Sequence, residues 1–314
     1  MMKIYKNDLD DSVVHVCSQI EDDSWVRLVN PTDKEIEEVS SKVGIPTTLI
    51  SQVLVEKELP RIKQIPGAVL VVMDVPYMKD KSIKNKYITC PLGIIICDNL
   101  HVITVSLQEH AFMDEFAKGN VETFFTYKKS RFLIQIFLKA SEVYLSTLSL
   151  IDEDIQKMEK NTYYSTNNRV LINFLNMQKT LVYFLTSLQA NSHVLERLYT
   201  DEILTMYDED KVLLGDAVIE NKQCIETSIV FRDILDSTMD TYGSIISNNL
   251  NVIMKFLAGI TIVFSIPTMI SSFLGMNVPL GVIGQSDYSF LVVCIVSFLV
   301  SFVIACWLKK RNML

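Results

Sequence analysis

The sequence predicts an α/β N-terminal cytosolic domain followed by long antiparallel helices and two C-terminal transmembrane helices. Three observations predict this order. Six of the eight prolines fall between residues 31 and 91, among short runs rich in β-branched residues. From residue 109 to residue 255 there is no proline, and apolar residues recur at helical spacing. Between Phe256 and Leu308 the only charged residue is Asp287.

The charge of the chain is acidic and unevenly distributed. The formal net charge is −8, and the four charged residues from position 287 onward contribute +2, so residues 1–286 carry −10. Such a body repels nucleic acid and anionic lipid headgroups, whereas it attracts metal cations. The composition therefore disfavours a nucleic-acid-binding protein and favours cations as partners.

Residues 1–108 are expected to form the α/β domain. Thr32 and Glu35 have the spacing of a capping box, in which each side chain bonds the backbone N–H of the other, and they predict a helix to about Val43. Asp98-Asn99 is a turn signal between the last two strands. Strands are predicted at 13–16, 25–29, 68–75, 87–97 and 102–107.

Residues 109–255 are expected to form a long helical bundle and stalk. Two apolar stripes follow coiled-coil spacing, each with one asparagine in its seam. We interpret them as two long antiparallel helices joined near 207–210, the second running from about 211 through 251 into the membrane segment. Most of these side chains should pack in a core. The stripes comprise Leu181, Phe184, Leu188, Asn191, Leu195 and Leu198, and then Leu235, Met239, Tyr242, Ile246, Asn249 and Ile253.

Two uncharged segments predict membrane spans at 256–273 and 288–308, joined by an extracellular loop at 274–287. Each is near the ~20 apolar residues that cross a bilayer as a helix. Buried core helices are the alternative, which the absence of charge disfavours. Lys255 and the basic tail at 309–314 flank the spans, and the loop has no basic residue. Positive-inside bias then places both termini in the cytoplasm of a multi-pass cell-membrane protein. The N-terminus has no secretory signal pattern, and the six scattered cysteines suit reduced core residues.

One face of the first span is polar, because Thr261, Ser265, Thr268 and Ser272 step by 4, 3 and 4. These hydroxyls have two explanations that stay open here: they bond back to carbonyls of their own helix or hold helices together, or they line water. Two spans cannot enclose a pore, so conduction needs a ring of several copies. Asn277 would then repeat around the outer mouth, where amide oxygens can bind the waters of hydrated Mg²⁺. Upstream, the same face continues through Asn251, Met254, and Leu257 or Ala258.

The chain resembles the CorA family of magnesium transport proteins over nearly its whole length. Four features carry the resemblance, together with the order of the domains. They are Met254-Lys255 at the start of span one, Pro267 within it, Gly275-Met276-Asn277 at its end, and the basic end Lys309-Lys310-Arg311.

The resemblance implies a funnel-shaped homopentamer that admits hydrated Mg²⁺, often also Co²⁺ or Ni²⁺, driven by the membrane potential. It implies Mg²⁺ as both transported and regulatory ion, with Asp216 as one regulatory ligand and Asp74 or Asp80 as candidates for its unplaced partner. By motif position, Gly275, Met276 and Asn277 set ion selectivity at the pore mouth. The implied pore lining is Asn251 at the cytosolic end, Met254 and Leu257 at a hydrophobic constriction, and then Thr261, Ser265, Thr268 and Ser272.

The chain also departs from this family. Many relatives have an acidic loop after the motif, whereas here only Asp287 is acidic within 278–287. Ser265 stands where relatives often have a bulkier apolar residue, which predicts a wider mid-pore. Two alternatives remain: the zinc-transporting branch of the superfamily, which Met276 disfavours, and a membrane-anchored coiled-coil sensor that conducts nothing.

Other polar groups receive plainer interpretations. Asp152-Glu153-Asp154 is expected to be a solvated helix face, and Asp208-Glu209-Asp210 a loop. The four histidines share no evident face with other metal ligands. The sequence has no Gly-rich phosphate loop and no convincing nucleophile–base pair. We therefore do not expect an enzyme.

Overall fold

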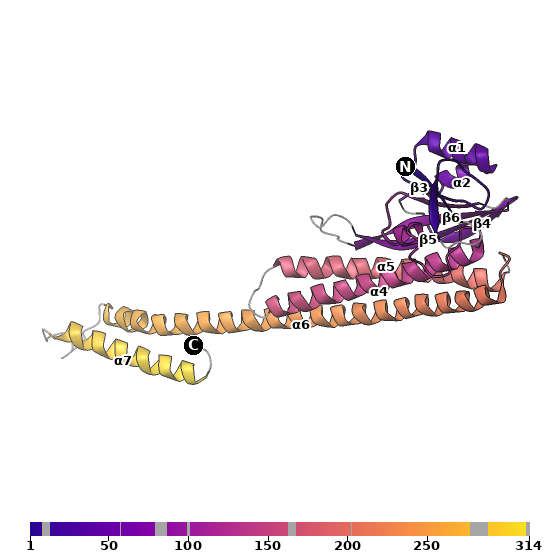
Figure 1. Cartoon of the computed structure of the whole chain (residues 1–314). Coiled ribbons are helices and arrows are strands. Elements are labelled where there is room, and N and C mark those ends of the chain that lie inside the picture. The colour runs from indigo at the N-terminus through magenta and orange to yellow at the C-terminus, as the bar shows by residue number, and fades with distance from the viewer. Residues whose placement is uncertain are drawn as a thin grey trace. The chain divides into compact units, whose positions relative to one another are not determined.

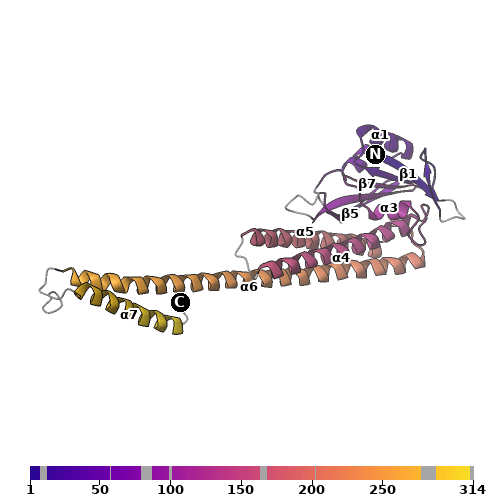
Figure 2. The same ribbon diagram turned by 60° about the vertical axis from the view of Figure 1, so that its left-hand side comes forward.

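The computed structural model describes residues 1–7, 13–56, 58–78, 87–98, 101–162, 168–201, 203–276 and 288–311. These residues form two compact units, Met1–Thr238 and Met239–Leu314. One helix, α6 (Asp208–Leu274), contributes residues to both units. Figures 1 and 2 show the chain in two orientations. Each unit is described by itself.

A seven-stranded sheet organises the first unit, with the strand order β2-β1-β3-β7-β6-β5-β4. Only the β3–β7 pair is parallel, and every other neighbouring pair is antiparallel. The longest pairing is the β5–β6 hairpin, in register from Ala68 opposite Cys97 to Met78 opposite Tyr87. The strands are β1 (Met2–Asn7), β2 (Val14–Cys17), β3 (Trp25–Val29), β4 (Arg61–Ile65), β5 (Ala68–Met78), β6 (Tyr87–Cys97) and β7 (Val102–Ser106).

The five predicted strands correspond to β2, β3, β5, β6 and β7, whereas β1 and β4 were not predicted. Both are short strands in which polar residues interrupt the apolar run. Strand β4 lies at the edge of the sheet, and its Lys63 and Gln64 are exposed. An edge strand pairs through its backbone and buries few side chains, so its sequence carries a weak pattern.

Two short helices, α1 (Asp33–Val43) and α2 (Thr47–Ser51), cover one face of the sheet. The predicted capping box begins α1: Thr32 Oγ1 accepts from the Glu35 N–H, and the Glu35 carboxylate accepts from the Thr32 N–H at 2.8 Å. Gly44 ends the helix with φ of 77°, a conformation that favours glycine. This end of the domain therefore folds as its local sequence specifies.

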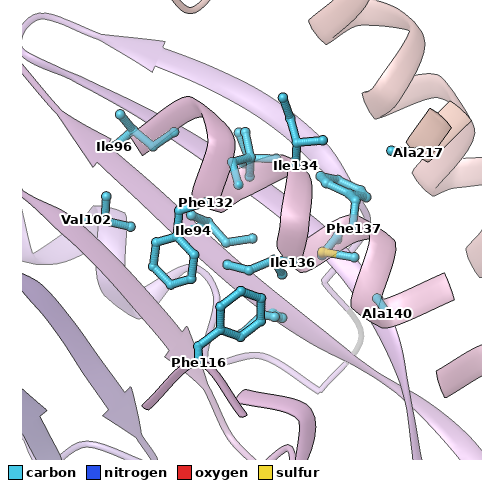
Figure 3. Close-up of a cluster of buried hydrophobic side chains, with 14 of the residues drawn as sticks. Ile94, Ile96, Val102, Phe116, Phe132, Ile134, Ile136, Phe137, Ala140 and Ala217 are labelled. Carbon is cyan, nitrogen blue, oxygen red and sulfur yellow. The ribbon is translucent and has the colours of Figure 1, made fainter. Parts of the chain in front are cut away.

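The other face of the sheet carries α3 (Phe112–Ala117), α4 (Lys129–Thr162), α5 (Asn168–Thr200) and the first part of α6. Figure 3 shows Phe116, Phe132 and Ile136 gathered with strand residues in this core. The rings of Trp25 and Phe132 pack edge to face with centroids 5.1 Å apart. Burial of these large side chains fixes the long helices on the sheet.

The stripe predicted on α5 is confirmed as core, since its residues from Leu181 to Leu198 are almost fully buried. The stripe on α6 is buried at Leu235 and Tyr242, but Ile253 is 60% exposed. One prediction was wrong: Asp208-Glu209-Asp210 is the first turn of α6 rather than a loop. Carboxylates are favourable there because the N–H end of a helix is partially positive.

The second unit contains the C-terminal part of α6 and α7 (Ser289–Lys310). Figures 1 and 2 show α7 lying beside the end of α6. Ser297, Ser301 and Leu308 are the buried residues of α7, and Pro267 lies inside α6. The two helices are close to the spans expected at 256–273 and 288–308.

Candidate functional site

The two helices of the second unit expose apolar surface over most of their length. Among the described residues, three helices are long and apolar enough to cross a membrane: α4, α6 and α7. They differ in what covers them, because half of the apolar window of α4 is buried, against 6% in α6 and 17% in α7. Phe264, Phe290 and Phe298 are each more than 70% exposed. Apolar patches of this extent mark a surface that contacts lipid or protein.

A polar strip interrupts this apolar surface on α6. At 100° per residue, Thr261, Ser265, Thr268 and Ser272 fall within an arc of about 60°. All four are exposed. Together with Ile260, Phe264 and Met269 they line a shallow groove of about 520 Å³. The structure therefore brings the four hydroxyls together as the spacing predicted, and adds three apolar neighbours that the sequence reasoning did not name.

Three of these hydroxyls donate to carbonyls of their own helix. Thr261 Oγ1 donates to Leu257 O at 2.8 Å, Ser265 Oγ to Thr261 O at 2.7 Å, and Thr268 Oγ1 to Phe264 O at 3.1 Å. Such i−4 bonds are typical of serine and threonine inside helices. The remaining candidates on this helix, Asn251, Met254 and Leu257, are also exposed.

The motif begins where α6 ends. The Gly275 N–H donates to Ser271 O at 2.9 Å and the Met276 N–H to Phe273 O at 3.4 Å, which satisfies two of the last carbonyls of the helix. A Cβ on Gly275 would lie 3.3 Å from Ser271 O, so a larger residue would crowd this turn. Asn277, the loop at 278–287 and its Asp287 lie outside the described residues.

The proposed regulatory residues lie in different environments. Asp216 is exposed on α6. Asp74 is buried between β5 and α5, where Ser187 Oγ donates to its Oδ2 at 2.6 Å, and burial raises the pKa of its carboxyl. This placement does not fit a ligand for an ion held between subunits. Asp80 lies outside the described residues.

An ion pair that the sequence reasoning missed fixes the start of α6. Arg131 on α4 contacts Asp210 through Nε at 2.7 Å and Glu209 through Nη2 at 2.8 Å. Asp210 is buried, and these hydrogen bonds raise the pKa of Arg131. The residues are far apart in the chain, so no spacing rule could have paired them.

The described residues contain no group of three or more His, Cys, Asp or Glu side chains that could hold a metal ion. Cys90, Cys97 and Cys224 are buried, and burial raises the pKa of Cys97 and Cys224 to about 12. Cys294 and Cys306 were expected to be core residues but are exposed on α7. Within the described chain, the hydroxyl strip of α6 is therefore the best candidate for contact with ions.

Comparison with known proteins gives consistent results. The model of the CorA-like Mg²⁺ transporter protein family matches residues 21–310. A cobalt/magnesium transport protein CorA from Methanocaldococcus jannaschii is 27% identical over 262 residues, which covers 81% of this chain and 79% of that protein. A similarly named protein from Thermotoga maritima is 24% identical over 188 residues, 60% of this chain and 54% of its own length.

The fold is also that of a solved structure. The complete CorA magnesium transporter of M. jannaschii superposes with a TM-score of 0.84 at 23% identity, over 99% of this chain and 98% of the other. The family match spans the α/β domain, the long helices and both exposed apolar helices, and it confirms the resemblance seen in the sequence. The chain belongs to the family of CorA-like Mg²⁺ transporter proteins.

Proposed function

We propose that the chain mediates influx of hydrated Mg²⁺, and of Co²⁺ as a second ion, across the cell membrane. The observation that carries this proposal is the extent of the family match, which runs through residues 21–310 and includes both apolar helices. The relative from M. jannaschii is a cobalt/magnesium transport protein, which supports the choice of ions. Ni²⁺ is a further candidate ion from the family resemblance.

The C-terminal part of α6 and α7 are the two membrane spans in this proposal. Helix α4 also has an apolar window, but it is less hydrophobic than those of α6 and α7, and its Phe132, Ile136 and Ala140 are buried in the core of the first unit. The apolar surfaces of α6 and α7 are left exposed and need a hydrocarbon environment. Lys309 and Lys310 in the last turn of α7 support a topology with both termini in the cytoplasm, by the positive-inside bias.

A conducting path requires several copies of the chain, and the family resemblance favours a homopentamer. Each copy contributes two spans, which cannot surround a channel. With α6 on the axis, the hydroxyl strip lines the channel, Asn251 lies at its cytosolic end, and Met254 and Leu257 form a hydrophobic constriction. Such a constriction closes by expelling water, and it opens when the helices separate enough to be wetted.

Ion selection in this proposal occurs at the outer mouth, where Gly275, Met276 and Asn277 follow α6. Mg²⁺ loses its waters reluctantly, so a ring of neutral amide oxygens can accept hydrogen bonds from those waters without holding the ion tightly. The membrane potential supplies the driving force, and no covalent step is involved. The chain acts as a transporter and not as an enzyme.

Regulation by cytosolic Mg²⁺ is a further part of the proposal. The exposed carboxylate of Asp216 on α6 is available to an ion shared with another copy. Binding of Mg²⁺ there would hold neighbouring copies together and favour the closed state. When cytosolic Mg²⁺ falls, the ion leaves and the closed state loses that stabilisation.

The test is uptake into proteoliposomes made with the purified full-length chain, with a Mg²⁺ indicator inside and an inside-negative potential. We expect Mg²⁺ uptake that saturates and that external Co²⁺ inhibits. Uptake of Zn²⁺ without uptake of Mg²⁺ would assign the chain to the zinc branch instead. A monomer or dimer in mild detergent, with no flux of either ion, would support a membrane-anchored sensor that conducts nothing.

A further inference from the structure

A carboxyl group is buried at the junction between β5 and α5. Asp74 is only 9% exposed, and Ser187 and Asn191 of α5 both contact it. In the part of the chain that the structure describes, no lysine, arginine or histidine forms an ion pair with this carboxyl. An ionised carboxylate is costly in such a place, because burial removes its water and no cation replaces it. The surroundings of Asp74 therefore favour its protonated, neutral form more than water does.

Three oxygens in a row connect this carboxyl to β6. Ser187 Oγ lies 2.6 Å from Asp74 Oδ2 and 3.0 Å from Thr89 Oγ1. A hydroxyl has one proton, so Ser187 donates to one of these neighbours and accepts from the other. When Asp74 is ionised, Thr89 donates to Ser187 and Ser187 donates to the carboxylate. When Asp74 is protonated, both donations reverse, so each protonation state keeps its hydrogen bonds without movement of the heavier atoms.

The other titratable groups of this junction supply no positive charge to Asp74. Tyr144 of α4 donates from its hydroxyl to Asp74 O at 3.1 Å, and burial raises the pKa of this hydroxyl well above its ordinary value. The nearby thiols are Cys90 of β6 and Cys224 of α6, and burial raises the pKa of Cys224 to about 12. Burial likewise raises the pKa of Asp74, while the hydrogen bond from Ser187 lowers it in part.

We propose that Asp74, together with Ser187 and Thr89, is a proton-binding switch that sets how firmly α5 is held to the sheet. Uptake of a proton from solvent removes the buried charge and keeps the junction closed. Loss of that proton leaves a carboxylate that is better solvated when α5 separates from β5, so the junction opens more often. The inference goes beyond the proposed function, since it concerns pH and does not require the chain to conduct ions.

The direction of the pH effect follows from the protons that each state binds. In the closed state the pKa of Asp74 is raised, whereas in an opened, hydrated state it returns toward its ordinary value of 3.8. Between these two values the closed state binds more protons. Its extra stability is therefore complete below 3.8 and is lost as the pH rises through the raised pKa. Within this window the opening constant of α5 rises by up to about ten-fold per pH unit, and above it the constant levels off.

Hydrogen exchange of the full-length chain, followed by mass spectrometry over a range of pH, measures this opening constant at the amides around Ser187 and Asn191. The exchange rates are corrected for the intrinsic pH dependence of amide exchange. Asp74→Asn has nearly the size of the neutral side chain but binds no proton. The ratio of opening constants in the unmodified chain and in this variant therefore isolates Asp74, because all other titrating groups are common to both. Asp240→Asn, at an exposed position of α6, is the matched control.

We expect this ratio to rise with pH by up to about ten-fold per unit and then to level off. Ser187→Ala removes the hydrogen bond that favours the ionised carboxyl, so its opening constant should level off at a higher pH than that of the unmodified chain. Asp240→Asn should follow the unmodified chain at every pH. Below the pH at which the ratio levels off, the infrared spectrum should contain a protonated-carboxyl band that Asp74→Asn lacks.

Two results would overturn the inference. One is a ratio of opening constants that does not change with pH, and the other is a curve for Ser187→Ala that levels off at the same pH as that of the unmodified chain. If Asp74→Asn does not fold, the comparison of Ser187→Ala with the unmodified chain decides alone. Each of these results is independent of Mg²⁺ uptake by proteoliposomes, so failure of the switch and failure of the proposed function are distinguished.

Discussion

The side-chain amide of Asn191 on α5 pairs with the backbone of Asp74 on β5. Asn191 Nδ2 donates to Asp74 O at 2.8 Å, and the Asp74 N–H donates to Asn191 Oδ1 at 2.9 Å. The pairing of β5 with β4 ends at Val72, opposite Arg61. Beyond that point Asn191 occupies the position of a neighbouring strand. It satisfies the buried N–H of Asp74, and it shares the Asp74 carbonyl with the hydroxyl of Tyr144, which donates to that oxygen at 3.1 Å.

Replacing Asn191 with alanine should destabilise the first unit by about 2 kcal/mol, because the buried N–H of Asp74 loses its partner and the Asp74 carbonyl loses one of its two donors. Chemical denaturation of the full-length protein, followed by the fluorescence of Trp25, measures this change. Asn249→Ala is the control, since Asn249 is exposed on α6. An equal free energy of unfolding in the two variants would show that the Asn191 pairing contributes nothing.

Replacing Arg131 with methionine should destabilise the start of α6 by about 3 kcal/mol, since it leaves the buried carboxylate of Asp210 without its cation. Hydrogen exchange of the first turns of α6 reports the change locally. Arg232→Met removes a comparable cation from an exposed pair with Asp233, and it should cost less than about 1 kcal/mol. Equal protection of α6 in the two variants would argue against this role of Arg131.

Acid should destabilise the first unit through His110. Burial, and then the nearby Arg27 guanidinium, lower the pKa of His110 from 6.5 to about 4. Between these values the unfolded chain binds more protons at this site than the native protein, so the free energy of unfolding falls as the pH drops from 6.5 to 4. The full effect is about 3 kcal/mol at 1.36 kcal/mol per pH unit.

His110→Phe should flatten this pH dependence, because phenylalanine keeps the ring contacts with Tyr77 and Phe112 but binds no proton. Denaturation midpoints at several pH values measure the slope. The raised pKa of Asp74 acts in the opposite direction, but it is common to both proteins and cancels in the comparison. His193→Gln, at an exposed site, is the control. Parallel slopes in His110→Phe and the unmodified chain would refute the assignment.

Asp216→Ala should weaken closure by cytosolic Mg²⁺, since it removes one carboxylate of the proposed regulatory site. Mg²⁺-dependent protection from a protease measures closure, and half-protection should need about ten-fold more Mg²⁺ when one charged ligand is lost. Glu153→Ala removes an exposed carboxylate of α4 that pairs with Lys157, and it should not alter protection. The same Mg²⁺ requirement in both variants would rule out Asp216 as a ligand.

Local signals in the sequence predicted much of the fold. The capping box of Thr32 and Glu35 begins α1, and the strands 25–29 and 87–97 have the predicted bounds. These elements are specified by residues close in the chain. The first turn of α6 was missed because a partner distant in sequence stabilises it, as Arg131 stabilises Asp210. Strands β1 and β4 were missed because polar residues interrupt their apolar runs.

At the candidate site, too, the sequence predicted only part of the structure of the hydroxyl strip. The spacing of Thr261, Ser265, Thr268 and Ser272 placed them on one face, and the structure confirms that they share one groove. Spacing alone could not tell whether their protons are free, which depends on side-chain rotamers and on the carbonyls one turn earlier. That detail decides between a strip that donates to other helices and one that accepts from water.

The most direct test of the proposed channel is Mg²⁺ uptake by Asn277→Ala in proteoliposomes beside the unmodified chain. Asn277→Gln, which keeps the amide, and Asn249→Ala, an exposed asparagine on α6, are its controls. If Asn277 forms the ion-binding ring at the mouth, the alanine variant should assemble normally but lose Mg²⁺ uptake, while Asn249→Ala retains it and Asn277→Gln retains part. Undiminished uptake in Asn277→Ala would contradict the account.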